Sequence, residues 1–300
     1  MAQGNLKIIE SLGKNRVKLN EPLAKHTTFG IGGPAALFYE AKTKEELIKA
    51  VKLARELKIS LFILGSGSNL LVSDKGWRGL VIKVKSQKSK VKSTRIVAEA
   101  GVILAKLVHV AADNSLTGLE TCAGIPGTVG GAVVGNAGTA DQWIGDLVES
   151  VEILDQEGQI RRLSQKDCQF GYRSSRFQKT KEIIVKITLK LRKGNPEKIK
   201  EKIAVILAKR KSQPKEKSAG SIFKNPSGKK AGWLIEKAGL KGRKKGRAQI
   251  SPQHANFIVN LGGAKSSDVV QLIKLAKTEV KKRFGIELKE EICLLGFAKI

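Results

Sequence analysis

The sequence is poor in cysteine, and its few cysteines are far apart. Cys122, Cys168 and Cys293 are odd in number and show no metal-ligand spacing. This pattern argues against a disulfide framework and against a metal site. It is typical of a protein of a reducing cytoplasm.

Long apolar runs are also absent. No stretch of 18 apolar residues occurs, so we expect no membrane-spanning segment. Residues 1–5 lack a charged region followed by an apolar stretch, so we expect no signal peptide and a cytoplasmic location. With 300 residues, 41% of them hydrophobic, the chain is long enough for about two domains with a sizeable core.

Acidic residues are scarce beside basic ones. The chain has 27 Asp and Glu against 56 Lys and Arg, a net charge of +29, which suits nucleic acid or small anionic ligands. Aromatic residues make up only 5% and do not alternate with basic positions as base stacking would need. Only Lys241 to Arg247 is a dense basic cluster. We therefore expect a solvated basic surface and no dedicated nucleic-acid partner, with a nucleic-acid-binding protein as an alternative from another class.

Glycine, in contrast, is plentiful, and one glycine-rich stretch organises the chain. Gly65 to Leu71 follows the apolar run Ser60 to Leu64, which reads as a buried strand entering a tight turn. Gly65 and Gly67 permit positive φ, and successive main-chain N–H groups of such a turn form an anion-binding nest. A phosphate or pyrophosphate is the expected guest, and an ordinary polar turn is the alternative. No Lys-Ser/Thr pair follows and no GxGxxG opens a helix, which excludes a Walker loop and a Rossmann fingerprint.

Two further segments are rich in glycine. They are His26 to Pro34 and Ala123 to Ala132, and the second holds four glycines within eight residues. Because glycine weakens both helices and strands, we interpret these glycines as places where the backbone approaches a flat or phosphorylated ligand.

The remaining pattern predicts an α+β fold. Thr43 and Glu46 predict a capping box at the start of a helix, and Ser266 or Ser267 is expected to cap a long amphipathic helix that ends at Gly285. Further helices are expected over residues 102–112, 196–210 and 231–238, strands over 36–40, 80–82, 96–98, 183–191, 257–260 and 286–295, and a hairpin over 151–163. Gly194 to Pro196 marks the expected boundary between two domains.

Six motifs occur together and in order. They are His26 to Pro34, Leu64 to Asp74, Gly118 to Gly131, Phe170 to Phe177, Ser218 to Pro226 and His254 to Gly263. In this combination the chain resembles the MurB family of UDP-N-acetylenolpyruvoylglucosamine reductases. The resemblance implies a flavin-binding module of the vanillyl-alcohol-oxidase (PCMH) type over residues 1–193 and a smaller α+β substrate domain over 194–300. Residues 178–217 contain no Tyr, which resembles the type II branch of the family.

The resemblance also implies the reaction and its cofactors. NADPH and non-covalent FAD would reduce the enolpyruvyl group of UDP-N-acetylglucosamine enolpyruvate to the lactyl ether of UDP-N-acetylmuramate, in peptidoglycan synthesis, with the enzyme acting as a monomer. Gly65 to Leu70 would hold the FAD pyrophosphate. The residues assigned to FAD in this way are Ile31, Gly32, Gly33, Gly65, Ser66, Gly67, Ser68, Asn69, Leu70, Gly124, Ile125, Gly127, Thr128, Gly130 and Gly131.

Three catalytic residues follow from the same resemblance. Arg173 matches an arginine that would grip the substrate carboxylate, and Ser221 matches the proton donor. Glu291 matches a second acid, but Leu288 to Glu291 lacks the proline of the family pattern, so Glu290 competes for this role. Lys217 and Asn225 would contact the uridine and diphosphate. Without the motifs, Arg173 would read as a surface arginine and Ser221 as a turn serine.

An oxidase of the same flavin fold is the alternative among flavoenzymes. Many such oxidases attach FAD through His or Cys near the pyrophosphate loop. Residues 60–80 contain neither residue type, which favours non-covalent FAD.

Overall fold

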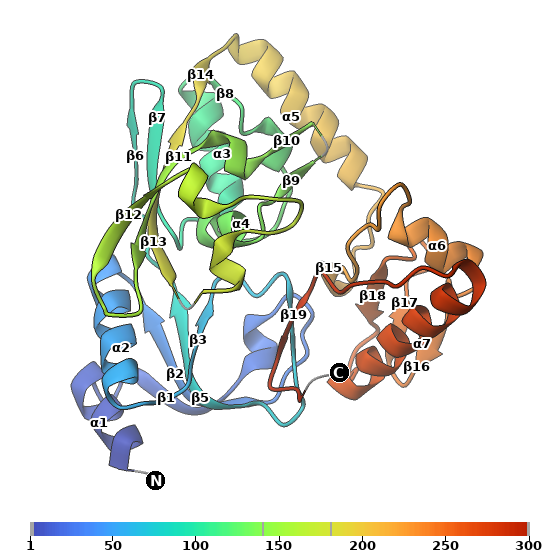
Figure 1. The fold of residues 1–300 in the computed structure, drawn as a ribbon, viewed down its shortest axis with the longest axis horizontal. Helices are drawn as coiled ribbons and strands as arrows, with labels where there is room; N and C mark the ends of the chain where they lie inside the picture. The colour runs from blue at the N-terminus through green and yellow to red at the C-terminus, as the bar shows by residue number, and fades with distance from the viewer. Residues whose placement is uncertain (1–2, 140, 181, 299–300) are drawn as a thin grey trace. The chain divides into compact units, whose positions relative to one another are not determined.

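A computed structural model describes residues 3–139, 141–180 and 182–298 (Figure 1). The helices are α1 (Gln3–Leu12), α2 (Lys44–Glu56), α3 (Leu104–Asp113), α4 (Val129–Val134), α5 (Pro196–Arg210), α6 (Ala231–Lys237) and α7 (Ser266–Phe284). The strands are β1 (Val17–Pro22), β2 (Pro34–Ala41), β3 (Leu61–Leu64), β4 (Leu70–Val72), β5 (Trp77–Val84), β6 (Ser89–Lys92), β7 (Arg95–Glu99), β8 (Leu116–Thr117), β9 (Gly138–Thr139), β10 (Gln142–Trp143), β11 (Val148–Leu154), β12 (Ile160–Ser164), β13 (Ile183–Lys190), β14 (Arg192–Lys193), β15 (Lys217–Ser221), β16 (Lys244–Lys245), β17 (Ala248–Ile250), β18 (Phe257–Asn260) and β19 (Cys293–Leu295). The chain is an α+β protein, as the sequence predicts.

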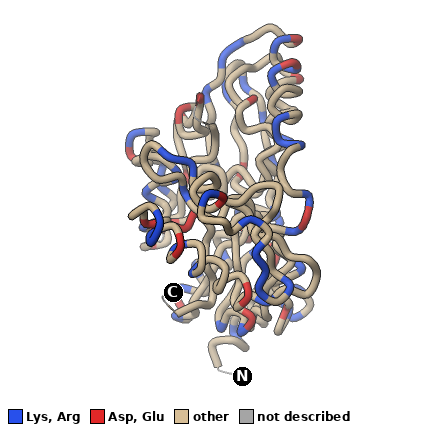
Figure 2. Tube along the Cα trace, turned by 90° about the vertical axis from the view of Figure 1, so that its right-hand side faces the viewer, with Lys and Arg blue, Asp and Glu red and all other residues tan. Residues whose placement is uncertain are grey.

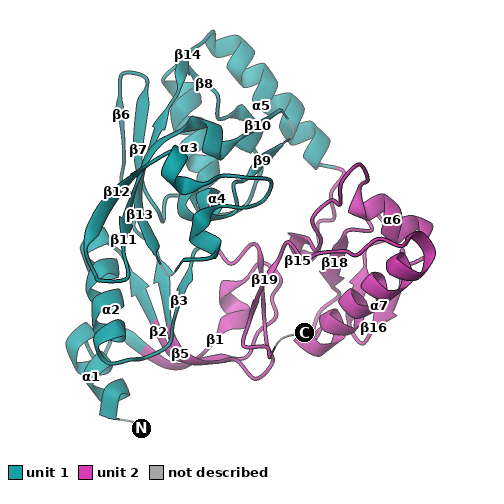
Figure 3. Cartoon of the chain, viewed as in Figure 1, with its two compact units in different colours: residues 1–17, 39–65, 81–211 teal, residues 18–38, 66–80, 212–300 magenta. Residues whose placement is uncertain are grey.

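The chain divides into two compact units (Figure 3). Unit 1 contains residues 1–17, 39–65 and 81–211, and unit 2 contains residues 18–38, 66–80 and 212–300. These units do not follow the expected boundary at residue 194, because α5 packs with unit 1 through Ile199 and Ile203. The division into a flavin module over 1–193 and a substrate domain over 194–300 stays a prediction.

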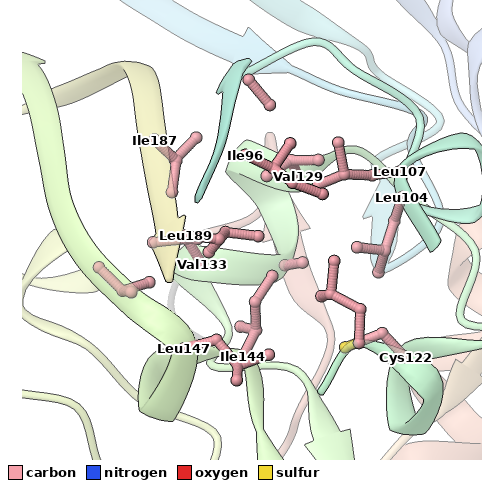
Figure 4. Packing of buried hydrophobic residues seen from close by; sticks show 14 of the residues in the cluster. Ile96, Leu104, Leu107, Cys122, Val129, Val133, Ile144, Leu147, Ile187 and Leu189 are labelled. Carbon is pink, nitrogen blue, oxygen red and sulfur yellow. The ribbon is translucent and has the colours of Figure 1, made fainter. Parts of the chain in front are cut away.

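Unit 1 is built on an antiparallel five-stranded sheet in the order β12-β11-β13-β7-β6. The second half of β13 alternates between buried and more exposed residues, so Ile187 and Leu189 point to one side. They pack with Val129 and Val133 of α4 and with residues of α3, as Figure 4 shows. This core supports the segment that leads into α4.

Unit 2 is built on a four-stranded sheet in the order β15-β18-β17-β16 and on helices α6 and α7. The inward face of α7 follows helical spacing, with Val269, Leu272, Ile273, Ala276 and Val280 buried. The helix ends at Gly285, whose φ of 68° is left-handed, as the sequence predicts. Strand β19 pairs in parallel with β4, which follows directly on the Gly65 to Asn69 loop.

Two details of α7 and its surroundings correct the sequence analysis. Neither Ser266 nor Ser267 caps α7. The carboxylate of Asp74 does so by accepting the amides of Ser266 (2.8 Å) and Ser267 (3.2 Å). The last strand spans only Cys293–Leu295, because residues 286–289 are not paired in a ladder.

The capping box at Thr43 forms only in part. The Thr43 hydroxyl accepts from the amide of Glu46, as expected. The Glu46 carboxylate, however, accepts from the amide of Lys42 and from the Arg16 guanidinium instead of returning to Thr43. The return bond of the capping box therefore goes to the amide of Lys42, one residue before Thr43.

Basic residues are spread along the chain, in helices and loops alike (Figure 2). Within the dense cluster, Arg247 donates to the main-chain oxygens of Leu261 and Gly262, and Lys241 pairs with Glu236. Part of the cluster thus holds unit 2 together. Among the described helices none is both long and apolar enough to cross a bilayer.

Candidate active site

The loop between β3 and β4 has part of the geometry of an anion nest. Gly67 is left-handed, with a φ of 66°, as predicted, whereas Gly65 is not among the glycines with positive φ, which corrects that half of the expectation. No described residue accepts a hydrogen bond from the main-chain amide of Ser66 or Gly67. Because buried or half-buried amides are normally paired, these two donors suit an anionic ligand such as a pyrophosphate.

Each end of this loop touches another glycine-rich segment. A Cβ atom on Gly65 would lie 2.7 Å from the hydroxyl of Thr128, within unit 1. A Cβ atom on Gly67 would lie 2.2 Å from the main-chain oxygen of His26, within unit 2. The amide of Thr28 also donates to the Gly67 oxygen, at 3.1 Å. The backbone of His26 and Thr27 therefore occupies the space in which a side chain at position 67 would lie.

The glycines after Ala123 have more than one cause. Gly130 and Gly131 lie in the first turn of α4, whose cap is the Thr128 hydroxyl accepting the Gly131 amide at 3.3 Å. A Cβ atom on Gly130 would lie 2.9 Å from Cβ of Ala100. Packing against Ala100 is thus one reason for glycine at position 130. The roles of this segment beside FAD stay predictions, for Gly124, Ile125, Gly127, Thr128, Gly130 and Gly131 alike.

The segment Ile31 to Gly33 is also held by the chain itself. Ile31 is buried in the core of unit 2, so only its backbone can face a cofactor. Gly33 donates its amide to Ser73, at 2.9 Å, and packs against the main chain of Asp74. The cofactor assignment of this segment stays a prediction.

Arg173 is held in a strained backbone conformation in unit 1. Its φ of 50° is left-handed, which is uncommon for a residue with a side chain. Its guanidinium donates to the main-chain oxygen of Gly138 at 3.2 Å and lies 5.0 Å from the ring centre of Trp143. Strain and cation–π packing together fix the direction of this cation.

A second arginine was missed by the sequence analysis. Arg210 ends α5, and its Cδ would lie 2.6 Å from a Cβ atom on Gly124. No described residue accepts a hydrogen bond from its buried Nε. Burial lowers the pKa of Arg210, and the charge of Arg173 lowers it further. Two neighbouring cations beside a glycine segment can bind an anion. In the sequence, Arg210 looks like any basic residue at the end of a helix, so nothing there indicated this role.

Ser221 ends β15 at a bulge in unit 2. Ser218 pairs with Val259 and Ser221 with Phe257, so β15 holds one residue more than β18 between these pairs. Gly220 supplies the left-handed φ of 75° that the bulge needs. A bulge turns the following side chain away from the regular ladder, so it sets the direction of Ser221.

The backbone of Glu291 lies beside the residue that follows this serine, whereas the Glu290 carboxylate is bonded to α7. The amide of Glu291 donates to the oxygen of Ile222 at 2.8 Å, one residue after Ser221. The carboxylate of Glu290 instead pairs with Lys277 of α7 at 2.8 Å. The chain segments that carry Ser221 and Glu291 thus lie side by side in unit 2, whereas Arg173 belongs to unit 1.

The two expected substrate contacts also have structural partners. The Cδ of Lys217 would lie 2.9 Å from a Cβ atom on Gly30, so its stem covers the first glycine turn. The side-chain oxygen of Asn225 accepts the amide of Ala231, at 2.9 Å, at the start of α6. Both side chains are oriented by these contacts, and their roles toward substrate stay predictions.

Burial of His254 predicts a pH-dependent stability. Burial lowers the pKa of His254 below its ordinary 6.5, and its Nδ1 accepts the amide of Asn256, which only the neutral ring can do. As pH falls through about 6.5 the unfolded chain binds the proton first, so stability present above that pH is lost below it. Denaturant unfolding at pH 7.5 and 5.5 should show a smaller loss for His254→Asn than for the wild type. The same change at exposed His109 is the control, and an equal loss in both variants would contradict the prediction.

The residues present fit FAD. The amides of Ser66 and Gly67, which no described residue accepts, offer two donors to a pyrophosphate. Thr128 packs against Gly65 and the Thr28 amide bonds to the Gly67 oxygen. The loop therefore offers main-chain donors to an anion such as the pyrophosphate of FAD.

Two family models match the chain. A model described as "FAD binding domain" matches residues 35–164, and one described as "UDP-N-acetylenolpyruvoylglucosamine reductase, C-terminal domain" matches residues 213–295. The UDP-N-acetylenolpyruvoylglucosamine reductase of Caldanaerobacter subterraneus subsp. tengcongensis is 45% identical over 293 residues, 97% of each chain. That of Clostridium tetani is 40% identical over 296 residues, covering 98% of this chain and 96% of the relative.

Solved structures agree with these matches. The chain resembles the MurB reductase of Thermus caldophilus with a TM-score of 0.81 and 39% identity, covering 93% of this chain and 98% of that one. It also resembles 4-ethylphenol oxidase from Gulosibacter chungangensis with a TM-score of 0.50 and 16% identity, over 64% of this chain and 43% of that one. The second likeness shows the fold alone.

Proposed function

The chain belongs to the UDP-N-acetylenolpyruvoylglucosamine reductase family of peptidoglycan synthesis, and on this premise we propose that it reduces UDP-N-acetylglucosamine enolpyruvate with NADPH as a cytoplasmic monomer. It is an oxidoreductase with FAD as its cofactor. The observation that supports the proposed chemistry is that the Glu291 amide donates to the oxygen of Ile222, the residue after Ser221.

The chain's own residues would hold FAD at the glycine loop. The amides of Ser66 and Gly67 would donate to its pyrophosphate, and the backbone of residues 31–33 and 124–131 would line the flavin. When bound, FAD carries a hydride from the nicotinamide to the substrate carbon. The FAD is expected to be non-covalent.

Arginine supplies the positive charge that the reaction needs. A hydride added to the enolpyruvyl double bond leaves negative charge beside the substrate carboxylate. Arg173, fixed by Gly138 and Trp143, would bind that carboxylate and stabilise the developing enolate. Arg210 would add a second positive charge in the same unit.

Ser221 would then protonate the enolate carbon. A serine hydroxyl is a weak acid, so it needs a partner that replaces its proton. Glu291 is the acid whose backbone lies beside Ser221, whereas Glu290 is engaged by Lys277. We therefore assign the second acid to Glu291, and the uridine diphosphate contacts to Lys217 and Asn225.

Anaerobic stopped-flow absorbance tests this function. NADPH should bleach the flavin of the purified protein, and UDP-N-acetylglucosamine enolpyruvate should restore its colour with formation of UDP-N-acetylmuramate. An oxidase of this fold would regain its colour with oxygen and not with the enolpyruvyl compound. A salt-dependent gel shift with steep loss of affinity would instead favour the nucleic-acid alternative.

The two neighbouring glutamates should behave differently. Glu291→Gln removes an acid beside Ser221 and should slow substrate-driven reoxidation about 10- to 100-fold. Glu290→Gln loses only a partly exposed ion pair with Lys277 and should change that rate less than about 2-fold. Rates from the same stopped-flow traces compare them, and a larger effect at Glu290 would reverse the assignment.

A further inference from the structure

Two asparagines flank the body of strand β18, and both are buried. Asn256 precedes the strand and Asn260 ends it, with exposed fractions of 4% and 7%. Each side chain bonds to the main chain of another segment of unit 2. The two segments differ, and each carries a different part of the proposed site.

Asn256 grips the residues that follow Ser221. Its side-chain oxygen accepts the amide of Phe223 at 3.0 Å, and its side-chain nitrogen donates to the oxygen of Phe223 at 2.8 Å. Its main-chain oxygen accepts the amide of Ile222, at 2.8 Å. A carboxamide that satisfies both main-chain groups of one residue acts as an additional strand residue. It extends the pairing of the two chains by two residues beyond the Ser221–Phe257 pair, where β15 ends.

The gripped segment is also the one that meets Glu291. The oxygen of Ile222 accepts the Glu291 amide at 2.8 Å, and the amide of Lys224 donates to Lys289 at 2.9 Å. The segment therefore lies between Asn256 on one side and residues 289–291 on the other. Movement of this segment would shift the serine relative to the acid.

Asn260 holds the glycine-rich segment His26 to Pro34 in a similar way. Its side-chain nitrogen donates to the oxygen of Phe29 at 3.0 Å, directly before Gly30. Its side-chain oxygen accepts the amides of Gly262 (2.9 Å) and Ala264 (3.1 Å). These bonds tie the turn that precedes Ile31 to Gly33 to the end of β18.

We propose that Asn256 and Asn260 are separate positioning residues, Asn256 for the Ser221 and Glu291 pair and Asn260 for the cofactor turn. The inference rests on the proposed function for the first role. Both side chains are buried and bonded through both the oxygen and the nitrogen, so either substitution should lower stability. What distinguishes positioning from stability is which functional quantity changes.

The matched pair Asn256→Asp and Asn260→Asp tests this division. Each variant keeps the side chain's size and one acceptor but replaces the donor that faces a main-chain oxygen. Asn256→Asp should slow substrate-driven flavin reoxidation about 10- to 100-fold, since small displacements of reacting groups have effects of this size. Flavin reduction by NADPH and the dissociation constant of FAD should change less than about 2-fold.

Asn260→Asp should show the opposite pattern. FAD should dissociate about 10-fold more readily when the holoenzyme is diluted, as followed by flavin fluorescence, because one bond to the turn is lost. Reoxidation measured on the flavin-bearing fraction should stay within about 3-fold of the wild type. Where an Asp variant does not fold, the Ala variant is measured in the same way.

Equal changes of all quantities in the two variants would overturn the inference and leave two structural asparagines. A normal reoxidation rate in Asn256→Asp would overturn the first role. Failure of the proposed function is distinct, because Ser221→Ala would then leave reoxidation unchanged. The Asn260 role is read from FAD release and does not depend on Ser221.

Discussion

Ser221→Ala should leave flavin reduction by NADPH near its normal rate and slow reoxidation by the enolpyruvyl substrate 10²- to 10⁴-fold. Only the second half-reaction needs a proton at the substrate carbon. Loss of a positioned proton donor of this kind raises the barrier by about 3–5 kcal/mol. Stopped-flow absorbance reads both half-reactions from one chromophore, so each variant supplies its own internal reference.

Ser218→Ala is the matched control for this change. Ser218 lies in the same strand on the other side of the bulge, and its main-chain oxygen, which accepts from Thr28, is kept in the variant. Both half-reactions of Ser218→Ala should stay within about 3-fold of the wild type. If Ser221→Ala instead slows reduction and leaves reoxidation intact, the assignment of the proton donor is wrong.

Patterns local in the sequence were predicted well. Helix α5 spans Pro196–Arg210 as expected, because Asn195 caps it and Pro196 occupies its first turn. The left-handed conformation of Gly67 followed from its place in a tight turn. The α+β class followed from the pattern of expected helices and strands, and the family followed from six motifs in order. Both can be read along the chain without knowledge of tertiary contacts.

Features set by distant partners could not be predicted. Asp74 caps α7 although it lies 192 residues before Ser266. Position 130 has no room for a side chain because Ala100 packs against it, and no local sequence pattern identifies that neighbour. The choice between Glu290 and Glu291 likewise depends on Lys277, a residue of another element. Sequence therefore gave residue types and order, whereas the direction of each side chain came from tertiary contacts.

Gly67→Val should abolish FAD binding while the chain still folds. Position 67 has a left-handed φ of 66°, and a Cβ atom there would lie 2.2 Å from the oxygen of His26 and 2.9 Å from Cα of Thr27. A Cβ position is fixed by the backbone, so rotation of the side chain cannot relieve these contacts and the loop must move. The amides of Ser66 and Gly67 would then point away from the pyrophosphate. We expect FAD affinity to fall by at least about 100-fold, because two hydrogen bonds to a charged group, each of about 1.5–3 kcal/mol, are lost.

Gly285→Val separates backbone strain from this close approach. Gly285 has nearly the same φ, 68°, but nothing lies within 4 Å of a Cβ atom there. Both variants should lose about 1–2 kcal/mol of stability from the left-handed conformation. Only Gly67→Val should also lose flavin, as measured by flavin content and by FAD titration of refolded protein. Undiminished FAD affinity in Gly67→Val would mean that residues 65–69 are an ordinary turn, and the search for the pyrophosphate would move to the start of α4.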